Sequence, residues 1–144
     1  LSKGLCCPVG SLLCGSREMV ERARRVRKRL GGGMRQAGIL AACGLIALET
    51  LRDRLAEDHR NAHRLAEGIA DVPGIAVDLE SVQTNMVYLA TDSPAPDVVR
   101  ALEAEGVRCL ALGPHTIRLV THRDVDSAGI EEAIAAFWRA ARAT

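Results

Sequence analysis

A lysine near the start of the chain carries the first side chain suited to covalent catalysis. Lys3 lies in the sequence Leu-Ser-Lys-Gly, shortly before the apolar stretch Val9 to Cys14, which predicts a short buried strand. A lysine amine beside small residues and close to buried strands is suited to Schiff-base chemistry as a nucleophile. An ordinary surface lysine fits the same residues, and without further context that interpretation is favoured.

A run of basic residues precedes three glycines. Six cations fall within eight positions: Arg22, Arg24, Arg25, Arg27, Lys28 and Arg29. A nucleic-acid interface is weakly supported, because no aromatic residues are interleaved for base stacking. A solvated helix surface is the common fate of such a run. The glycines fit best with a third interpretation, a backbone turn that brings Arg35 and a neighbouring cation to a phosphate.

A third candidate is an arginine within a stretch of strand-forming residues. Arg118 lies in Thr-Ile-Arg-Leu-Val, and strand alternation places it on the face opposite Ile117 and Leu119. There it is either an exposed strand residue or a fixed guanidinium fork aimed at a carboxylate. The spacing leaves both interpretations open.

The histidines do not predict a metal site. His59 and His63 are four residues apart on an expected helix, a spacing that two metal ligands on one face can have. Their neighbours are charged and polar and no third ligand is evident, so a solvated helix face is favoured. His115 and His122 flank the strand of Arg118, and their roles stay undecided.

Cysteine usage indicates a reducing compartment. The five cysteines are Cys6, Cys7, Cys14, Cys43 and Cys109. They are odd in number and show no CxxC spacing, which fits poorly with a disulfide framework or a zinc site. We expect reduced thiols in small apolar slots.

Composition and length are typical of a soluble globular protein. The chain has 144 residues, 48% of them hydrophobic and 26% charged, with a net charge of +1. The longest apolar run, Ala37 to Leu48, is shorter than the roughly 20 residues that a membrane-spanning helix needs. No secretory signal is expected at the start, and Leu1 is either a processed end or a cut.

The first third of the chain predicts helices. Ser16 is an expected cap for a helix that ends near Leu30, because Gly31 to Gly33 have no helical preference. Gln36 to Glu49 is apolar nearly all round, so we expect a helix buried on all sides, covered by further sequence or by a partner subunit. From Leu51 to Ile69 the pattern is that of an amphipathic helix.

The remainder predicts a small α/β unit. The expected strands are Ile75–Val77, Met86–Ala90, Val107–Ala111 and Ile117–Thr121. The expected helices are Pro96–Glu105 and a terminal helix with an apolar stripe from Ile130 to Ala141. We therefore expect helices on one face of a largely antiparallel sheet, with a domain boundary near Thr50 that separates residues 1–50 from residues 51–144.

Four stretches together resemble one enzyme family. They are LSKGL with PVGSLL at 1–13, RKRLGGGMRQAGILAA at 27–42, QTNMVYL at 83–89 and IRLVTH at 117–122. In this order they resemble the low-specificity L-threonine aldolases, which have the fold type I, aspartate-aminotransferase-like fold and use pyridoxal 5'-phosphate (PLP). The resemblance implies the carboxyl-terminal part of that fold, with residues 1–50 as a remnant of the large domain and residues 51–144 as the small α/β domain.

The resemblance also implies roles for individual residues. Lys3 would be the residue that binds PLP covalently, and Arg118 would hold the α-carboxylate of the substrate. Lys28 and Arg35 would line the site near phosphate and substrate, reaching a neighbouring subunit's site, and Asn85 would brace the pocket near Arg118. The implied reaction cleaves L-threonine or L-allo-threonine to glycine and acetaldehyde, with a base that the sequence does not name.

Further properties of the family are expectations here. They are an amino-acid substrate, a homotetramer, a cytoplasmic location, and no membrane or nucleic-acid partner. The paired Cys6 and Cys7 stand where small residues are usual, and the family's longer amino-terminal region has no counterpart in these 144 residues. Another fold type I lyase and a non-catalytic subunit-association module stay open as alternatives.

Overall fold

The chain divides into two compact units. In a computed structural model that describes residues 1–143, an N-terminal unit comprises Leu1–Leu55 and a C-terminal unit comprises Ala56–Thr144. The sequence suggested a boundary near Thr50. None of the helices in the described part of the chain has both the length and the apolar composition that crossing a membrane requires.

The first helix of the N-terminal unit begins and ends as its sequence predicts. Helix α1 spans Arg17–Arg29, and the Ser16 hydroxyl accepts a hydrogen bond from the Met19 N–H at 3.3 Å. At the other end, Gly31 and Gly32 donate their N–H groups to carbonyls of the last turn at 3.2 and 2.9 Å. Gly31 has φ +79°, which glycine adopts without steric cost, so the helix ends in a Schellman motif.

The second helix is buried on one side only. Helix α2 spans Gly38–Ile46 and continues as a π-helix, Ala47–Leu51. Gly44 and Ala47 are buried, whereas 81% of Ile39 is exposed. The residues of this unit thus cover one face of α2 and leave the other open, and the expected burial on all sides by further sequence or a partner subunit stays a prediction.

The segment before α1 does not form the expected strand. Residues 9–14 have no strand geometry and are almost all exposed. The loop closes on itself instead, because the Leu1 backbone nitrogen donates to the Gly10 carbonyl at 2.7 Å and the Cys7 N–H donates to the Leu1 carbonyl at 3.1 Å. A strand needs a neighbouring strand for its backbone groups, and the described N-terminal unit contains no strand.

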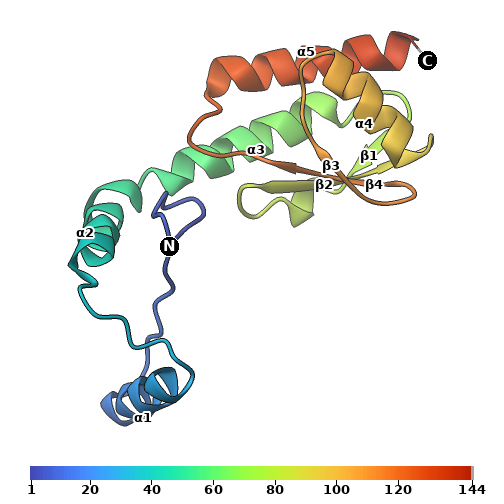
Figure 1. The fold of residues 1–144 in the computed structure, drawn as a ribbon. Helices are drawn as coiled ribbons and strands as arrows, with labels where there is room; N and C mark the ends of the chain where they lie inside the picture. Colours follow the sequence, from blue (N-terminus) through green and yellow to red (C-terminus); the bar gives the residue numbers. More distant parts are fainter. Residues whose placement is uncertain (144) are drawn as a thin grey trace. The chain divides into compact units, whose positions relative to one another are not determined.

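The C-terminal unit has the expected α/β architecture. Its strands are β1 (Ile75–Val77), β2 (Met86–Thr91), β3 (Leu110–Gly113) and β4 (Thr116–Val120). They form one antiparallel sheet in the order β1-β2-β4-β3. Its helices are α3 (Leu55–Ile69), α4 (Ala95–Ala104) and α5 (Ser127–Ala143), with a short 3-10 helix at Leu79–Ser81. The helices lie on one side of the sheet (Figure 1).

The hydrophobic core lies between this sheet and the helices. Val87 and Leu89 of β2 and Ile117 and Leu119 of β4 are buried, whereas their alternate neighbours face outward. The helices contribute apolar side chains to the same cluster, among them Ala62, Leu65, Ile69, Leu102, Ile130, Ile134 and Phe137. Strand β1 matches its predicted range and β2 and β4 differ from theirs by one residue at an end, whereas β3 begins at Leu110 rather than Val107.

Candidate functional site

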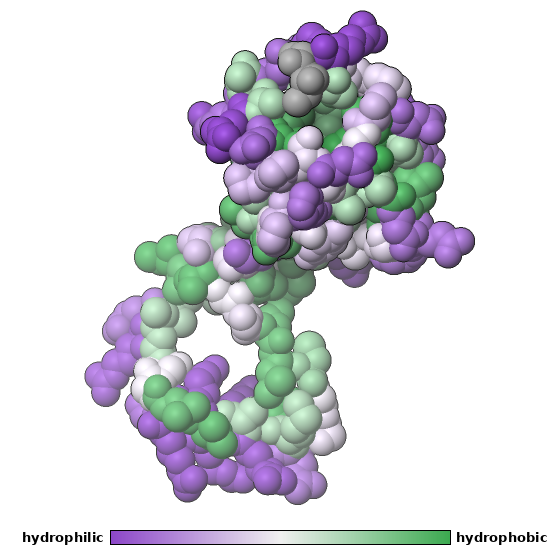
Figure 2. All heavy atoms as spheres, turned by 90° about the vertical axis from the view of Figure 1, so that its right-hand side faces the viewer, coloured by the Kyte–Doolittle hydropathy of each residue, from purple (hydrophilic) through white to green (hydrophobic). Residues whose placement is uncertain are grey.

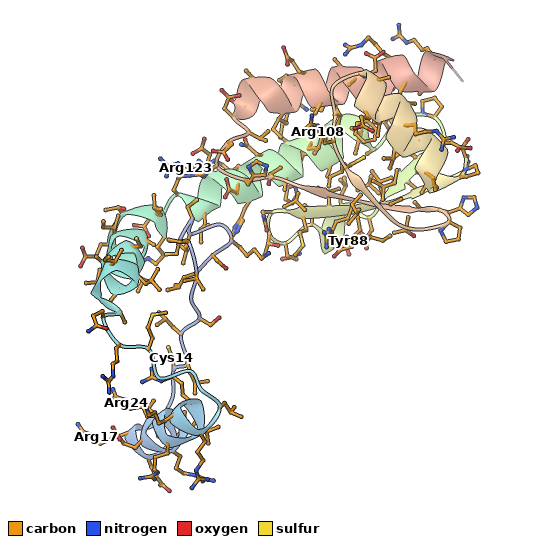
Figure 3. All side chains as sticks on the ribbon, in the orientation of Figure 1. Cys14, Arg17, Arg24, Tyr88, Arg108 and Arg123 are labelled. Atoms are coloured by element: carbon orange, nitrogen blue, oxygen red, sulfur yellow. The ribbon has the colours of Figure 1, made fainter. Side chains whose placement is uncertain are left out.

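Arg118 occupies the middle of β4 on the face of the sheet that the helices leave open. Its neighbours across the two ladders are Tyr88 on β2 and Leu110 on β3. Figure 3 shows Tyr88 on the side of the sheet away from the helices. The Nε atom of Arg118 is shielded from solvent and has no hydrogen-bond partner. Strand alternation thus places the guanidinium as the sequence predicts, on a face that is otherwise largely apolar.

Arg118 differs from several other arginines of the C-terminal unit in that they form ion pairs within the described chain and it does not. Arg64 contacts Glu131 at 2.6 Å, Arg100 contacts Asp97 at 2.6 Å and Arg139 contacts Glu105 at 2.6 Å. Among residues 1–143, no side chain forms an ion pair or hydrogen bond with the Arg118 guanidinium. A shielded donor without a partner costs about 1–3 kcal/mol, which an incoming anion can offset. The geometry therefore suits a carboxylate, which takes two parallel N–H bonds from guanidinium.

Asn85 holds the backbone next to this strand. Its side-chain Nδ2 donates to the Thr121 carbonyl at 2.8 Å, and its own carbonyl accepts the Thr121 N–H at 2.9 Å. The Thr121 hydroxyl donates in turn to the Asp58 carbonyl of α3 at 2.7 Å. These bonds tie the start of β2 to the end of β4. Sequence reasoning missed Thr121, for which a threonine directly after a strand was the available signal.

Lys3 lies in a tight turn of the N-terminal unit. Its side chain is exposed, and its carbonyl accepts the Cys6 N–H at 2.8 Å. Cys6 has φ +57°, an uncommon conformation for a residue with a side chain. Within the described chain the Lys3 amine has no hydrogen-bond or ion-pair partner, so it is accessible to an electrophile.

Lys28 and Arg35 lie on either side of the glycine turn. The Lys28 side chain folds over Gly33, where an added Cβ would lie 2.8 Å from its Cδ and 3.3 Å from its Nζ. A larger residue at position 33 would therefore displace the ammonium group. Arg35 is exposed, and Gln36 after it has φ +47°. Two cations beside a glycine-rich backbone can bind an anion.

The five predicted site residues fall into two sets. Arg118 and Asn85 belong to neighbouring strands of the C-terminal unit. Lys3, Lys28 and Arg35 belong to the N-terminal unit, where Lys28 and Arg35 share one turn and Lys3 lies in a separate loop. Each set offers exposed or unpaired cationic groups.

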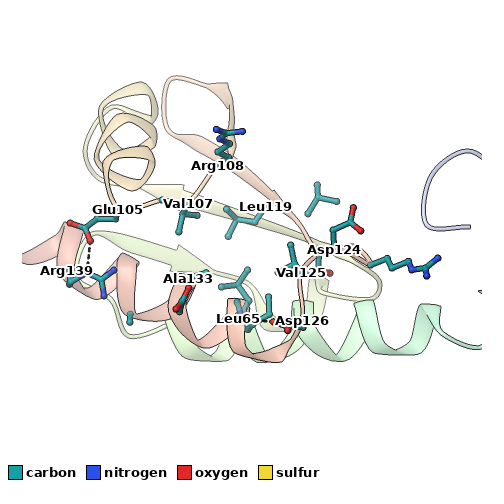
Figure 4. Close-up of a pocket in the computed structure, with 18 residues that line it drawn as sticks. Leu65, Glu105, Val107, Arg108, Leu119, Asp124, Val125, Asp126, Ala133 and Arg139 are labelled. Atoms are coloured by element: carbon teal, nitrogen blue, oxygen red, sulfur yellow. Dashed lines mark hydrogen bonds and ion pairs between the residues drawn. The ribbon is translucent and has the colours of Figure 1, made fainter. Parts of the chain in front are cut away.

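A large groove of the C-terminal unit lies elsewhere. Its volume is about 730 Å³, and it runs between α5 and the segments around Val107 and Val125 (Figure 4). The Arg139–Glu105 ion pair of 2.6 Å lies at one end. None of the five predicted site residues lines it. The groove is on the helix side of the sheet, the side opposite the Arg118 guanidinium.

The cysteines and histidines show no assembled centre. All five cysteines are free, and burial, followed by the charge of Glu103, raises the pKa of Cys109 to about 11. His63 faces Glu67 at 3.7 Å on an exposed helix surface. No group of three or more His, Cys, Asp or Glu side chains that could hold a metal ion occurs among the described residues.

Sequence comparisons relate the chain to lyases. The family model described as "Beta-eliminating lyase" matches residues 1–92. The chain is 38% identical over 144 residues to low-specificity L-threonine aldolase 1 of Arabidopsis thaliana and 44% identical over 141 residues to low specificity L-threonine aldolase of Escherichia coli K12. Each match covers 97% of this chain but 40% of the relative. The chain thus spans less than half the length of these relatives.

Solved structures show the fold. A putative aromatic amino acid beta-eliminating lyase/threonine aldolase from Exiguobacterium sp. 255-15 matches 96% of this chain and 42% of its own, with a TM-score of 0.75 and 21% identity. A mutant of C-DES with glycine covalently linked to its PLP cofactor matches 73% of this chain and 28% of its own, with a TM-score of 0.56 and 24% identity. The α/β fold of the chain is therefore shared with part of each of these larger proteins.

Proposed function

Because the chain belongs to the beta-eliminating lyase family, we propose that it forms part of a PLP-dependent L-threonine aldolase. Such an enzyme would cleave L-threonine and L-allo-threonine to glycine and acetaldehyde. The observation that carries the proposal is the unpaired guanidinium of Arg118, held on an open sheet face between Tyr88 and Leu110. Relatives that are 38–44% identical and named for this activity support the reaction type.

The residues of the N-terminal unit fit the chemistry of PLP. The cofactor carries an aldehyde, which an accessible lysine amine can attack, and a phosphate, which cations beside a glycine turn can bind. Lys3 offers that amine, and Lys28 and Arg35 offer those cations. When bound, PLP would supply the electron sink for the pair released as the Cα–Cβ bond of the substrate breaks.

Arg118 would act by positioning. Its guanidinium fork would hold the substrate α-carboxylate in a bidentate manner, which fixes rotation about the bonds at Cα. Asn85 and Thr121 would keep β4 in register beneath it through their shared hydrogen bonds. Orientation of this kind can supply a large part of a rate enhancement, because the entropy of alignment is lost on binding.

We also propose the setting of this activity. The complete enzyme would be a cytoplasmic homotetramer whose reaction yields glycine, with Lys28 and Arg35 reaching a neighbouring subunit's site. The exposure of both cations on the N-terminal unit supports this arrangement.

Covalent labelling tests the role of Lys3. The chain contains two lysines, Lys3 and Lys28, so PLP addition followed by borohydride reduction and peptide mass spectrometry gives a simple readout. We expect at least about tenfold more label on Lys3 than on Lys28, and loss of that label in Lys3→Arg but not in Lys28→Arg. Equal labelling of both lysines, in the chain alone and in the complete enzyme, contradicts the assignment.

A conservative substitution tests the role of Arg118. In the complete enzyme, Arg118→Lys keeps the charge but loses the fork, so we expect kcat/KM for L-threonine to fall about 100-fold, a loss of about 3 kcal/mol. PLP attachment at Lys3 should persist. Arg100→Lys, on the exposed surface of α4, is the matched control and should change kcat/KM less than about twofold. A similarly small change in Arg118→Lys would remove the proposed carboxylate contact.

A β-elimination activity is the rival, favoured by the description of the family model. Elimination from a β-substituted amino acid releases a keto acid and ammonia, whereas aldol cleavage releases glycine and an aldehyde. Assaying both product classes over a panel of β-substituted amino acids separates the two reactions.

A further inference from the structure

The Arg118 side chain lies among apolar neighbours. The C-terminal unit exposes apolar side chains between charged ones (upper part of Figure 2). On the outward face of the sheet around Arg118 they include Met86, Tyr88, Leu110 and Val120. The Nε atom of Arg118 is shielded from solvent, although the residue as a whole is only partly buried. An arginine can bury its aliphatic stem on apolar surface and leave its terminal nitrogens accessible, so the side chains that cover the stem decide where the fork points.

The strand register identifies the side chains that flank the stem. Arg118 lies directly opposite Tyr88 on β2 and Leu110 on β3, and directly opposite residues of a ladder share one face. Tyr88 is 45% exposed and Leu110 is 51% exposed, so neighbours cover about half of each side chain. Of the two, the tyrosine presents the larger and more rigid surface, because its ring is planar and turns about two side-chain bonds.

The fold fixes the ring of Tyr88 rather than its hydroxyl. Among residues 1–143, the hydroxyl contacts the Sδ atom of Met86 at 3.9 Å, and a thioether sulfur is a weak acceptor. A strong hydrogen bond would point to the hydroxyl as the functional group. Its absence within the described chain points to the ring.

The side chains on the two sides of the fork differ in size. Along the ladder, Met86 pairs with Val120 on one side of Arg118, and Ala90 pairs with Thr116 on the other. The first pair is large and apolar, whereas the second is small and exposed. Room for an anion beside the guanidinium therefore lies over Ala90 and Thr116.

We propose that Tyr88 is a positioning residue for the carboxylate contact of Arg118. Its ring covers the stem at Nε and directs the two terminal nitrogens toward the open side over Ala90 and Thr116. A fork that is fixed before binding loses less conformational entropy when it takes a carboxylate. The inference rests on the proposed function for the identity of the anion, an amino-acid carboxylate, and adds the residue that aims the fork.

Hydrogen exchange of the Arg118 Nε–H tests whether the ring covers it. In the full chain, labelled for NMR, the signal is identified by its loss in Arg118→Lys. We expect solvent exchange to be at least about tenfold faster in Tyr88→Thr, which removes the ring but keeps a strand-forming residue, and to change less than about twofold in Tyr88→Phe. Met86→Thr, on the same face of β2, is the matched control and should leave the rate unchanged.

The ring can also be observed directly. Tyr88 is the only tyrosine of the chain, so its ring signals are assigned without ambiguity. We expect nuclear Overhauser effects between the ring protons and the Cδ protons of Arg118 in the wild type.

Anion binding tests the consequence for the fork. In an acetate titration followed by the Arg118 signal, with chloride at equal ionic strength as the control, the half-saturating concentration should rise at least about fivefold in Tyr88→Thr and less than about twofold in Tyr88→Phe. In the complete enzyme, KM for L-threonine should rise about tenfold in Tyr88→Thr while kcat changes less than about threefold, because ground state and transition state lose the same contact.

Two results would overturn the role of Tyr88. Equal exchange rates in the wild type and Tyr88→Thr, or no Overhauser effect between ring and stem, would show that other groups shield Nε. Exchange as fast in Tyr88→Phe as in Tyr88→Thr would make the hydroxyl the essential group. Both results leave Lys3 labelling and the Arg118→Lys assay as tests of the proposed function. A wild-type Arg118 signal that acetate does not move, with exchange faster in Tyr88→Thr, would count against the carboxylate contact of the proposed function and not against cover by the ring.

Discussion

The two units of the chain differ in how they hold their apolar residues. The C-terminal unit surrounds a core in which Val87, Ile117 and Phe137 are at most 2% exposed. The N-terminal unit has helices with good local signals but few buried side chains, and Ile39 is 81% exposed. Local sequence thus makes a helix in either unit, but only the C-terminal unit packs its helices around a core of its own.

The two units also differ in net charge. The N-terminal unit has eleven Lys and Arg against four Asp and Glu, a net charge of +7, and the C-terminal unit has eight against fourteen, a net charge of −6. Their near-cancellation explains why the chain as a whole is almost neutral. A unit that is both strongly basic and apolar at its surface is equipped for contact with other molecules rather than for independent stability.

The largest expected difference in stability is between truncating a buried side chain of the C-terminal unit and truncating an exposed side chain of the N-terminal unit. Phe137→Ala removes a ring that is 2% exposed and should destabilise the C-terminal unit by about 3–5 kcal/mol. Ile39→Ala removes a side chain that is 81% exposed and should change stability by less than about 0.5 kcal/mol. Urea unfolding followed by Trp138 fluorescence and circular dichroism measures both. A large loss in Ile39→Ala would show that α2 is packed within the chain in solution.

Adding a methyl group at one glycine in each unit compares their packing, with a smaller expected effect on stability. A Cβ at Gly68 would collide with the Ile134 side chain, and the Gly68 carbonyl accepts a hydrogen bond from the Trp138 indole at 3.1 Å. Gly68→Ala should therefore cost about 1–3 kcal/mol through overpacking between α3 and α5. Gly38 has open space, so Gly38→Ala should be neutral or stabilising by up to about 1 kcal/mol. Thermal unfolding of the two variants checks the contrast, which equal shifts in Tm would contradict.

Local signals were sufficient for much of the fold. The Ser16 cap and the three glycines predicted both ends of α1, and strand alternation predicted β2, β4 and the face on which Arg118 lies. The apolar residues at 9–14 predicted a buried strand that does not form, because a strand depends on what lies beside it. Periodicity shows that a side is apolar but cannot show whether the same chain supplies its cover.

The candidate site was predictable only in part. The sequence predicted that Arg118 lies in a strand and which face of the sheet it occupies. Its lack of a partner follows from the strand register, which places Tyr88 and Leu110 beside it. The Thr121 bonds went unnoticed because they join residues far apart in the sequence. The role of Lys3 stays a prediction from the family resemblance, since an exposed turn is equally compatible with an ordinary lysine.

Two threonines extend the comparison to hydrogen bonds. Thr121 donates to the Asp58 carbonyl at 2.7 Å from a buried position, and Thr50 donates to the Ile46 carbonyl at 2.7 Å from an exposed one. Thr121→Val should cost about 1–2 kcal/mol, because the isosteric change leaves a buried acceptor without this donor. Thr50→Val should cost less than about 0.5 kcal/mol, since water replaces the hydroxyl. Urea titration measures the free energy of unfolding of both variants. An equal loss of stability at both positions would contradict the expected effect of burial on these hydrogen bonds.

The smallest expected effect concerns a surface ion pair of the C-terminal unit. Arg64 on α3 binds Glu131 on α5 through two contacts of 2.6 and 2.7 Å, and the hydrogen bond, then the charge, of Arg64 lowers the pKa of Glu131. A carboxylate whose pKa is depressed stabilises the fold above its unfolded pKa, and this contribution is lost as pH falls through the folded pKa. Because both groups are exposed, Glu131→Gln should lower Tm at pH 7 by less than Thr121→Val does.

The pH and salt dependence of the lowering of Tm in Glu131→Gln tests whether the effect is electrostatic. The Tm gap between the wild type and Glu131→Gln should close as the pH falls through the lowered pKa of Glu131, where the carboxyl becomes protonated, and also in 1 M salt, where the Debye length is about 3 Å. In the N-terminal unit, Glu21→Gln is the control, because Glu21 meets Arg24 at 3.9 Å within a single helix and joins no two elements. A gap for Glu131→Gln that persists at low pH and in high salt would mean that the side chain acts through packing between α3 and α5.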